Sequence, residues 1–407
     1  MRSNVATVSA ETTGREAAVV HPPILMFNQK DLSVPSGETT HIVELARALS
    51  ELGERVTVIS PRVGRYQGEL PFTVRYLPVP SRPRAARLLA LEAVLWPWLL
   101  TRPEIWRRRA FIYVRKGLFM LAPLLVARAF RLPSILEVNG AEGESAQLYG
   151  LSRLTVGIML SLSRIAYRLA RHIITVTPGL ANYIEQAGAV PADKISVLHN
   201  GANTNLCRPQ DREACCAKLG LPPDRRYIVF TGHMAHWHRL DLLVDAMPQV
   251  IKAVPEAHLL FVGQGSEVPV VQERLATLGL AHHATFQGPV PFTEVPDWVG
   301  AATVCVALAT IDRLSPIKLF EYMACGRPVV VTDAVGLAEP VRGSGCGPVC
   351  KPEPADLAAG LISVLQEDAA GWSALCRRAR EAAVSQYSWQ ATGERTLAII
   401  NRLWAGH

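Results

Sequence analysis

Short apolar runs rich in β-branched residues alternate with longer stretches of helical periodicity, and this alternation limits the fold of the chain more than any other feature. It is typical of a parallel sheet covered by helices, because the connection between two parallel strands is usually helical. The pattern occurs twice, on either side of a polar, turn-rich stretch at Asn200–Pro209. The sequence therefore predicts an α/β protein with two doubly wound halves.

The expected elements follow from the period of the apolar residues. In the first half we predict strands at Ile24–Phe27, Val56–Ser60, Phe111–Val114, Ser134–Val138, Ile173–Val176 and Ile195–Leu198, with helices at Glu38–Leu52, Leu118–Phe130, Arg153–Ala170 and Leu180–Ala187. In the second half we predict strands at Tyr227–Thr231, His258–Val262, Ala284–Gln287, Val304–Ala307 and Val329–Val331, with helices at Leu240–Lys252, Val268–Leu278, Phe292–Val299 and Pro316–Cys325. Three helical patterns close the chain, at Ala355–Leu365, Trp372–Ser385 and Gln390–Trp404.

A length of 407 residues fits two domains. We predict an N-terminal tail at 1–20, a Rossmann-like domain at 21–202, a second one at 203–388, and a helix at 389–407 that packs back on the first domain. Open α/β sheets bind ligands beyond the carboxyl ends of their strands. Two such domains in tandem therefore predict a ligand in the cleft between them.

The eight cysteines all lie in the second half, and no pair has CxxC spacing. We expect reduced thiols and a cytoplasmic protein; a metal or disulfide at Cys346 and Cys350 is the alternative. The longest apolar run, Leu88–Leu100, is too short to span a bilayer and contains Glu92 and Pro97. The first twenty residues lack the apolar segment of a secretory signal.

The net charge of +7 is unevenly distributed: residues 1–190 hold 23 Lys and Arg against 14 Asp and Glu, whereas residues 191–407 hold 19 against 21. Much of the excess lies between Arg82 and Lys116. This composition indicates a helix that rests on an anionic membrane surface or binds an acidic acceptor. A solvated basic face over a buried helix would have the same composition. No known nucleic-acid-binding module accompanies the basic residues, so we expect no nucleic-acid partner.

The most informative motif is the segment from Ser315 to Val331. Ser315 is a favourable N-cap, Pro316 is favoured at the first helical position, and Gly326 is favoured just beyond a helix end. A helix start offers free backbone N–H groups to a diphosphate, here those near Ile317. Lys318 falls in the first turn, and Glu321 on the same face can accept two hydrogen bonds from a ribose diol. The alternative is an ordinary capped helix with a surface Lys–Glu pair.

This segment resembles the donor-site signature of the retaining glycosyltransferases of family 4, in which two Rossmann-like domains face each other in the GT-B fold. The resemblance implies that Glu321 binds the ribose of a nucleotide sugar. The first glutamate of the signature, which holds the transferred sugar, maps onto Arg313. Asp312 could take its place sterically.

A second segment, Tyr227–Asp241, is predicted to be a strand, a turn at Gly232 and a helix start. In the family an Arg and a Lys here contact the donor pyrophosphate, and they match His233 and His238. Arg239 and Lys318 are our candidates to supply the missing positive charge. The alternatives are three histidines on a surface loop, or a zinc site that adds His236.

Shorter segments extend the resemblance over nearly the whole chain. Gly37 and His41 lie in a stretch like the glycine-rich loop near the reacting centre, and Asn139 matches the N-terminal catalytic histidine of the family. Gly263 and Val290 lie in segments like the loops that contact the nucleotide base. The stretch Val197–Asn205 resembles the interdomain segment. Glu142 and Glu144 either contact acceptor hydroxyls or belong to a solvated loop.

The resemblance implies transfer of a sugar from a UDP- or GDP-sugar to a hydroxyl acceptor, with retention and with neither metal nor cofactor besides the nucleotide-sugar co-substrate. The acceptor would be a lipid-linked glycan or a small molecule, in polysaccharide, glycolipid or secondary-metabolite glycosylation. We expect a cytoplasmic protein, peripheral on the inner face of the membrane. The alternative is a catalytically impaired, nucleotide-sugar-binding subunit of a glycosylation complex. An epimerase or phosphorylase would need a catalytic constellation of its own, and none stands out.

Overall fold

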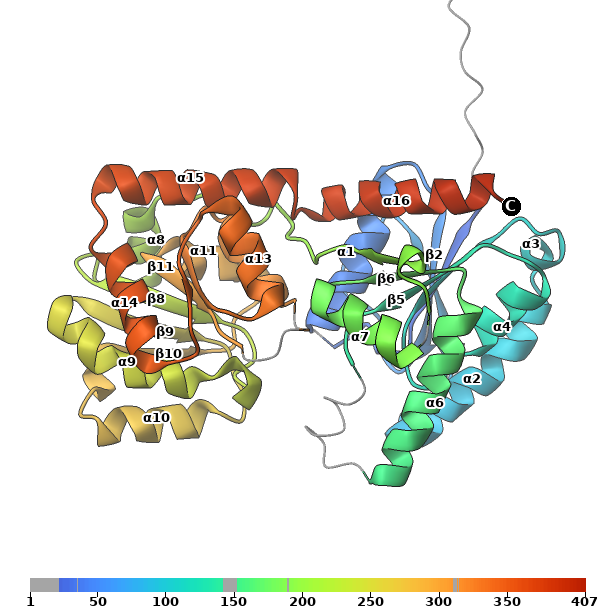
Figure 1. Cartoon of the computed structure of the whole chain (residues 1–407), viewed down its shortest axis with the longest axis horizontal. Helices are drawn as coiled ribbons and strands as arrows, with labels where there is room; N and C mark the ends of the chain where they lie inside the picture. Colours follow the sequence, from blue (N-terminus) through green and yellow to red (C-terminus); the bar gives the residue numbers. More distant parts are fainter. Residues whose placement is uncertain (1–21, 35, 142–151, 189, 310–312, 314) are drawn as a thin grey trace, which may run out of the picture.

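The computed structural model describes residues 22–407 apart from 35, 142–151, 189, 310–312 and 314. Two domains lie side by side, each with a parallel sheet covered by helices (Figure 1). The predicted fold class, two facing Rossmann-like α/β domains, is confirmed. The predicted tail at 1–20 lies outside the described residues.

The N-terminal domain contains a seven-stranded sheet in the order β3-β2-β1-β4-β5-β6-β7, and every pair is parallel. Its strands are β1 Ile24–Phe27, β2 Val56–Arg62, β3 Thr73–Pro78, β4 Phe111–Arg115, β5 Ser134–Val138, β6 His172–Thr175 and β7 Ile195–Val197. Its helices are α1 Gly37–Glu51, α2 Arg84–Leu100, α3 Pro103–Trp106, α4 Ala122–Ala129, α6 Arg153–Leu169 and α7 Pro178–Gly188. The short 3-10 helix η1 Ala192–Lys194 precedes β7.

The C-terminal domain contains a six-stranded parallel sheet in the order β10-β9-β8-β11-β12-β13. Its strands are β8 Arg226–Thr231, β9 Ala257–Val262, β10 Ala284–Gly288, β11 Val304–Ala307, β12 Val329–Thr332 and β13 Val349–Cys350. Its α-helices are α8 Arg212–Leu219, α9 Leu240–Ala253, α10 Val268–Thr277, α11 Val295–Gly300, α12 Ile317–Ala324, α13 Val335–Ser344, α14 Pro354–Leu365 and α15 Ala369–Ser385. Three 3-10 turns are η2 His236–His238, η3 Ala281–His283 and η4 Phe292–Glu294.

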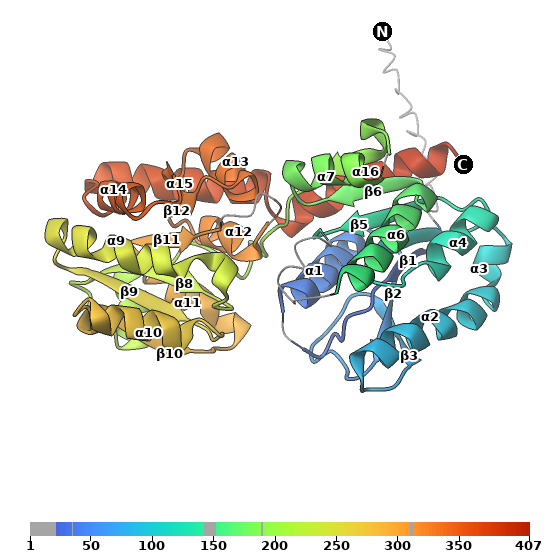
Figure 2. The same ribbon diagram turned by 60° about the horizontal axis from the view of Figure 1, so that its bottom comes forward.

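The order of strands reverses between β1 and β4 in the first sheet and between β8 and β11 in the second. Such switch points open a crevice at the carboxyl ends of the strands, where ligands of open α/β sheets bind. Helix α1 follows β1, and helix α12 follows β11. Figure 2 shows these two helices on the facing sides of the two domains. The fold therefore brings two helix starts to the domain junction.

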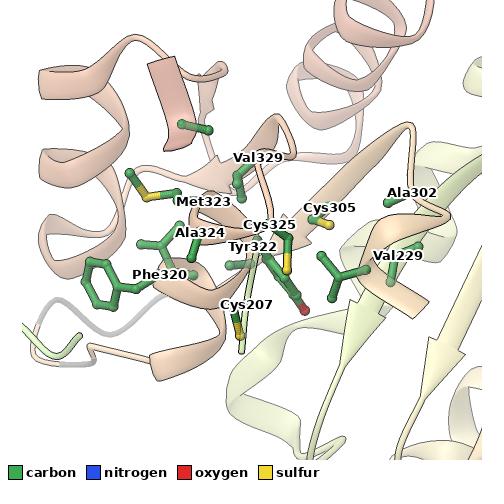
Figure 3. Close-up of a cluster of buried hydrophobic side chains, with 14 of the residues drawn as sticks. Cys207, Val229, Ala302, Cys305, Phe320, Tyr322, Met323, Ala324, Cys325 and Val329 are labelled. Carbon is green, nitrogen blue, oxygen red and sulfur yellow. The ribbon is translucent and has the colours of Figure 1, made fainter. Parts of the chain in front are cut away.

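Helix α12 is fixed by the core of the C-terminal domain. Figure 3 shows Phe320, Tyr322 and Met323 in a buried cluster with Cys207 and Cys325. The hydroxyl of Tyr322 accepts a hydrogen bond of 2.7 Å from the backbone N–H of Thr231, which ties α12 to the end of β8. All eight cysteines are free thiols, as expected.

The chain crosses between the domains twice, and the two crossings contact each other. The N–H of Ala202 donates to the carbonyl of Tyr387 at 2.8 Å, and the N–H of Trp389 donates to the carbonyl of Ala202 at 3.1 Å. A Cβ on Gly201 would lie 2.6 Å from the Trp389 nitrogen, so only glycine permits this approach. Beyond the crossing, helix α16 (Trp389–Ala405) packs against α1 of the N-terminal domain (Figure 1).

The elements that were not predicted include two strands, β3 at the edge of the N-terminal sheet and β13 of the C-terminal half, and two helices of the C-terminal half. Strand β3 is an edge strand whose residues are mostly exposed or half-buried, and β13 has only two residues, so neither forms a buried apolar run. Helix α13 contains Gly336, Pro340 and Gly343, which are typical of loops. Helix α8 is short and polar, and it follows the boundary stretch directly.

Candidate active site

The start of α12 differs from the prediction in one detail. The residue that flanks the helix is Pro316, which has an extended backbone (φ −72°, ψ 128°), and the helix begins at Ile317. Ser315 lies one residue too early to act as the N-cap, so that assignment was wrong. Its hydroxyl oxygen is buried and has no hydrogen-bond partner among the described residues. No side chain of the described residues caps the first turn, which leaves its backbone N–H groups for a ligand.

Lys318 lies in that first turn, in a partly buried position. Its Nζ is 3.8 Å from the centre of the Phe230 ring and 3.5 Å from His238 Nε2. Gly232, after β8, lies alongside, since a Cβ on it would be 3.5 Å from the same Nζ. Burial lowers the pKa of Lys318 to about 7, and the charge of Glu321 only partly offsets this effect.

Glu321, one turn further along, is 7% exposed. Burial raises the pKa of its carboxyl to about 7, against the influence of Lys318, and the nearby carboxylate of Glu44 on α1 adds to the rise. The charges of Lys318 and Glu321 are therefore both desolvated, and their mutual attraction does not offset the cost of burial. Clustered pKa shifts of this kind are characteristic of ligand-binding and catalytic sites.

His238 supports Lys318 instead of adding a second positive charge. Its Nδ1 lies 3.4 Å from the carbonyl of Leu308, and Lys318 can only donate to Nε2. Burial, followed by the charge of Lys318, holds the pKa of His238 well below its usual range, so the ring is neutral. His233, at the other position predicted to contact the pyrophosphate, is exposed.

Arg239, the second residue predicted to supply the missing positive charge, forms an ion pair with Asp241 of α9. Its Nε and Nη2 donate to the carboxylate of Asp241 at 3.0 and 2.9 Å, and its backbone is left-handed with a φ of 45°. Of the two cations that we expected near the diphosphate, Lys318 lies at the helix start, whereas Arg239 is held by an acidic partner.

The glycines of the predicted donor loops pack against one another. The N–H of Gly232 donates to the carbonyl of Val262, and the N–H of Gly263 donates to the carbonyl of Gly288, both at 2.8 Å. A Cβ on Gly263 would lie 2.0 Å from the Gly232 carbonyl oxygen, which excludes any other residue there. Val290, after β10, is half-buried against the core cluster that includes Tyr322.

The N-terminal side of the site is organised around Glu137, which the sequence interpretation missed. This buried carboxylate at the end of β5 accepts hydrogen bonds from Tyr113 at 2.5 Å, from Arg115 at 3.1 Å and from Asn139. His41 Nε2 lies 2.7 Å from it in an ion pair that lacks the direction of a hydrogen bond. Burial alone would raise the pKa of Glu137, but His41, Arg115 and Tyr113 outweigh it and hold the pKa below its usual range.

The structure thus brings together His41 and Asn139, two of the three predicted catalytic residues, through a shared carboxylate. The amide oxygen of Asn139 is buried and has no hydrogen-bond partner among the described residues. Gly37, the third, begins α1 and faces the start of α12, since a Cβ on it would lie 3.8 Å from Ile317 Cδ1.

A hydrogen-bonded connection crosses from this cluster to the C-terminal domain. His41 Nδ1 lies 2.7 Å from Asn200 Oδ1, and Asn200 Nδ2 donates to the carbonyl of Ser315 at 2.5 Å. Asn200 belongs to the predicted interdomain stretch, but no pattern in the sequence indicates that its side chain joins the two sites. Asn139 and Ser315, at the two ends of the connection, both carry a buried polar atom that lacks a partner in the described part of the chain.

The position of the missing signature glutamate faces the other domain. The guanidinium of Arg313 lies 4.7 Å from the ring centre of Tyr183 on α7. Asp312, Glu142 and Glu144 lie outside the described residues. Within those residues, no group of three or more His, Cys, Asp or Glu side chains is placed to hold a metal ion. Nor is any helix there long and apolar enough to cross a bilayer.

Comparison with protein-family models finds two matches. The model described as Glycosyltransferase Family 4 matches residues 35–206, and the model described as Glycosyl transferases group 1 matches residues 225–367. Each match covers the core of one domain.

Curated relatives include D-inositol 3-phosphate glycosyltransferases. The one from Thermobispora bispora is 25% identical over 428 residues, which cover 98% of this chain and 94% of the relative. D-inositol 3-phosphate glycosyltransferase 1 of Catenulispora acidiphila is 30% identical over 221 residues, or 52% of each protein. The alignment thus spans about half the length of this relative.

Solved structures show the same fold. The sucrose-phosphate synthase of Thermosynechococcus elongatus superposes with a TM-score of 0.77 at 19% identity, covering 95% of this chain and all of the other. Anabaena Alr3699/HepE in complex with UDP and glucose gives a TM-score of 0.72 at 18% identity, covering 94% of this chain and 100% of that chain. The two-domain architecture is therefore that of GT-B glycosyltransferases.

Proposed function

The chain belongs to the group 1 glycosyl transferases of family 4, and from that premise we propose that it transfers a sugar from a nucleotide diphosphate sugar to a hydroxyl acceptor. The observation that carries the proposal is the start of α12, where Lys318 and Glu321 are both desolvated and where no side chain in the described part of the chain caps the first turn. A bound donor would supply an anionic partner for Lys318 and hydrogen-bond donors for Glu321.

The donor nucleotide is proposed to lie on the C-terminal domain. Its diphosphate would accept hydrogen bonds from the first turn of α12 and from Lys318, because a helix start and a cation together suit an anion. Glu321 would accept hydrogen bonds from the ribose hydroxyls. The Ser315 hydroxyl, which has no partner among the described residues, would donate a further hydrogen bond to the diphosphate. A UDP-sugar is the first donor to test, since HepE was solved with UDP and with UDP-glucose, and a GDP-sugar is the second.

The proposed reaction retains the configuration of the transferred sugar. The bond between the anomeric carbon and the phosphate oxygen breaks, the acceptor oxygen bonds to the same face of that carbon, and the acceptor proton moves to the departing phosphate oxygen. Such a step needs alignment and charge stabilisation more than a separate base. The helix start and Lys318 would stabilise the leaving diphosphate, so the step requires no metal and no cofactor.

The acceptor is proposed to bind the N-terminal domain beside the start of α1. A hollow of about 260 Å³ there is lined by Gln29, Lys30, Ser36, Glu38 and Arg87, among others. The Oε1 of Gln29 and the Nε of Arg87 are buried without hydrogen-bond partners among the described residues. Mixed charges and unpartnered polar atoms suit a polyhydroxylated acceptor. The free oxygen of Asn139 could accept a hydrogen bond from a hydroxyl of the sugar or of the acceptor.

Contact with an anionic membrane on its cytoplasmic face is proposed for the outer helices of the N-terminal domain. Helix α2 buries Leu91, Leu95 and Leu99 but exposes Leu89 and Trp96. The neighbouring helices expose further large apolar side chains, namely Trp106, Leu125, Leu154, Ile158 and Ile165. Exposed apolar groups next to arginines favour a lipid surface with anionic headgroups. Binding to anionic vesicles that is lost on substituting Arg107, Arg108 and Arg109 would support this contact, and absence of binding would favour a soluble acceptor.

A turnover screen tests the proposed function. The full chain is incubated with UDP- and GDP-sugars, with and without polyol acceptors, and release of free nucleoside diphosphate is measured. Release from one donor supports a transferase. Binding of the nucleotide without any release would favour the impaired binding subunit, and no binding of any nucleoside diphosphate would refute the proposal.

A further inference from the structure

We propose that Asn200 is a positioning residue for sugar transfer, which holds the start of α12 against His41 and so fixes the donor site relative to the N-terminal domain. The proposal rests on the transferase function proposed above, and it concerns a residue that touches neither the nucleotide nor the acceptor. Its basis is the hydrogen bonding around the Asn200 side chain.

The orientation of the Asn200 amide is determined by its C-terminal neighbour. The carbonyl oxygen of Ser315 can only accept a hydrogen bond, so the NH₂ group of Asn200 must face it, at 2.5 Å. The amide oxygen then faces His41 Nδ1 at 2.7 Å. Because Asn200 is buried, water does not compete for either bond.

His41 is held between two groups that only accept. Nδ1 must carry a hydrogen to reach the amide oxygen of Asn200, and Nε2 lies 2.7 Å from the carboxylate of Glu137. Arg115 and Tyr113 keep Glu137 ionised by further hydrogen bonds. The ring of Trp389 packs edge-on against His41, with 5.0 Å between the ring centres, so the second crossing of the chain fixes the imidazole too.

The connection ends one residue before the cap of α12. Asn200 holds the Ser315 carbonyl, Pro316 follows, and the helix that carries Lys318 and Glu321 begins at Ile317. A shift of α12 relative to the N-terminal domain would move the donor away from the acceptor. Misplacement of reacting groups by about 1 Å can cost on the order of 100-fold in rate. Nucleotide binding would not change, because its proposed contacts all lie in the C-terminal domain.

If Asn200 had a purely structural role, substitution of another residue in the same stretch should have the same effect. Asn203 provides the matched control. Asn203 lies on the same interdomain stretch and donates to Glu44 of α1 at 3.1 Å. Its oxygen accepts from the backbone N–H groups of Asn205 and Leu206, at 3.2 and 3.1 Å. Substitution of Asn203 therefore perturbs the same stretch without a direct link to α12.

The experiment compares Asn200→Ala, Asn200→Asp and Asn203→Ala with the wild type in the full chain. Nucleoside diphosphate affinity, kcat for transfer, the ratio of transfer to hydrolysis, and Tm are measured for each. Asn200→Asp keeps an oxygen for His41 but loses the N–H that holds Ser315, so we expect it to fold even if Asn200→Ala does not. Both Asn200 variants should lose on the order of 100-fold in kcat and transfer less per hydrolysis, with nucleotide Kd within about twofold of the wild type. Asn203→Ala should keep kcat within about threefold, whatever its Tm.

The proposal is overturned if Asn200→Asp transfers sugar as well as Asn203→Ala does, or if nucleotide affinity falls in parallel with kcat. A wild type that binds nucleotide sugar but does not transfer it would refute the proposed function and this inference together. An active wild type with an active Asn200→Asp refutes this inference alone.

Discussion

Glu137 and Glu321 are both nearly fully buried carboxylates, one in each domain, but their pKa values move in opposite directions. Glu137 is surrounded by His41, Arg115 and Tyr113, and its pKa lies below the usual range. At Glu321 the charge of Lys318 does not offset burial, and the pKa rises to about 7. Burial is similar at the two sites; what differs is the number of partners.

We interpret this difference as the difference between a preformed structural cluster and a ligand-binding site. A buried charge with a full set of partners stabilises one arrangement of its neighbours, whereas a buried charge without them raises the free energy of the ligand-free protein. The N-terminal cluster is of the first kind. The start of α12 is of the second kind, with Lys318 and Glu321 both displaced towards neutrality.

The largest effect expected from this comparison is on stability. Glu137→Gln leaves the buried guanidinium of Arg115 and the imidazole of His41 without their carboxylate and should lower the free energy of unfolding by about 3–5 kcal/mol. Glu321→Gln removes a charge that is costly to bury, so at pH 8 it should leave that free energy unchanged or slightly increased. Urea unfolding of the nucleotide-free proteins at pH 8 measures both. Equal losses in the two variants would show that the two carboxylates do not differ in this way.

The next effect concerns the two cations expected near the diphosphate. Lys318→Ala should lower kcat by roughly 100- to 1,000-fold, because the leaving diphosphate loses its stabilising charge. Arg239→Ala should change kcat only slightly, since the Arg239 guanidinium is held by Asp241. Steady-state kinetics with the best donor compares the two. A larger loss in the Arg239 variant would place the diphosphate near α9 instead.

A smaller effect is expected on nucleotide affinity. Glu321→Ala removes the acceptor of the ribose hydroxyls, and a hydrogen bond to a charged group contributes about 1.5–3 kcal/mol, so Kd should rise roughly 10- to 100-fold. Asn139→Ala, on the opposite side of the cleft, should leave Kd for the free nucleoside diphosphate unchanged. Calorimetric titration of both variants checks this contrast, and equal weakening would argue against a nucleotide confined to the C-terminal domain.

The smallest effect is a dependence of donor affinity on pH. Below about pH 7 Glu321 becomes protonated and loses acceptor strength, and above about pH 7 Lys318 loses the charge that a diphosphate requires. Affinity for a nucleotide sugar should therefore be highest near pH 7 and fall about tenfold from pH 7 to 8.5. Lys318→Ala should remove the alkaline decline, and Glu321→Gln the acidic one. An affinity that is flat between pH 6 and 8.5 in the wild type would contradict these assignments.

Much of the fold was predictable because its strands are short buried runs bounded by turn residues. The predicted strand Val304–Ala307 coincides with β11, and Ser134–Val138 coincides with β5. Strand β3 was missed because only Leu77 in it is buried, and an edge strand needs no apolar run. Gly326, predicted to end α12, has the left-handed φ of 63° that the prediction requires.

The candidate site was predicted less completely, because hydrogen bonds between distant residues leave no trace in local sequence. Lys318 and Glu321 could be found from a helix start, but the pairing of Arg239 with Asp241 and the link from Asn200 to Ser315 could not. Glu137 did leave a signal: a glutamate within a five-residue strand that is buried throughout must have partners. Ser315 was misassigned because a serine before proline is a common helix start, whereas here its carbonyl is held by Asn200.

The most direct test of the central claim is calorimetric titration of the full chain with UDP and GDP at pH 7, repeated for a Lys318→Ala, Glu321→Ala double variant. We expect saturable one-site binding of one of the two nucleotides to the wild type and its loss in the double variant, with Tm retained. Binding to neither nucleotide, or unchanged binding in the folded double variant, would contradict it.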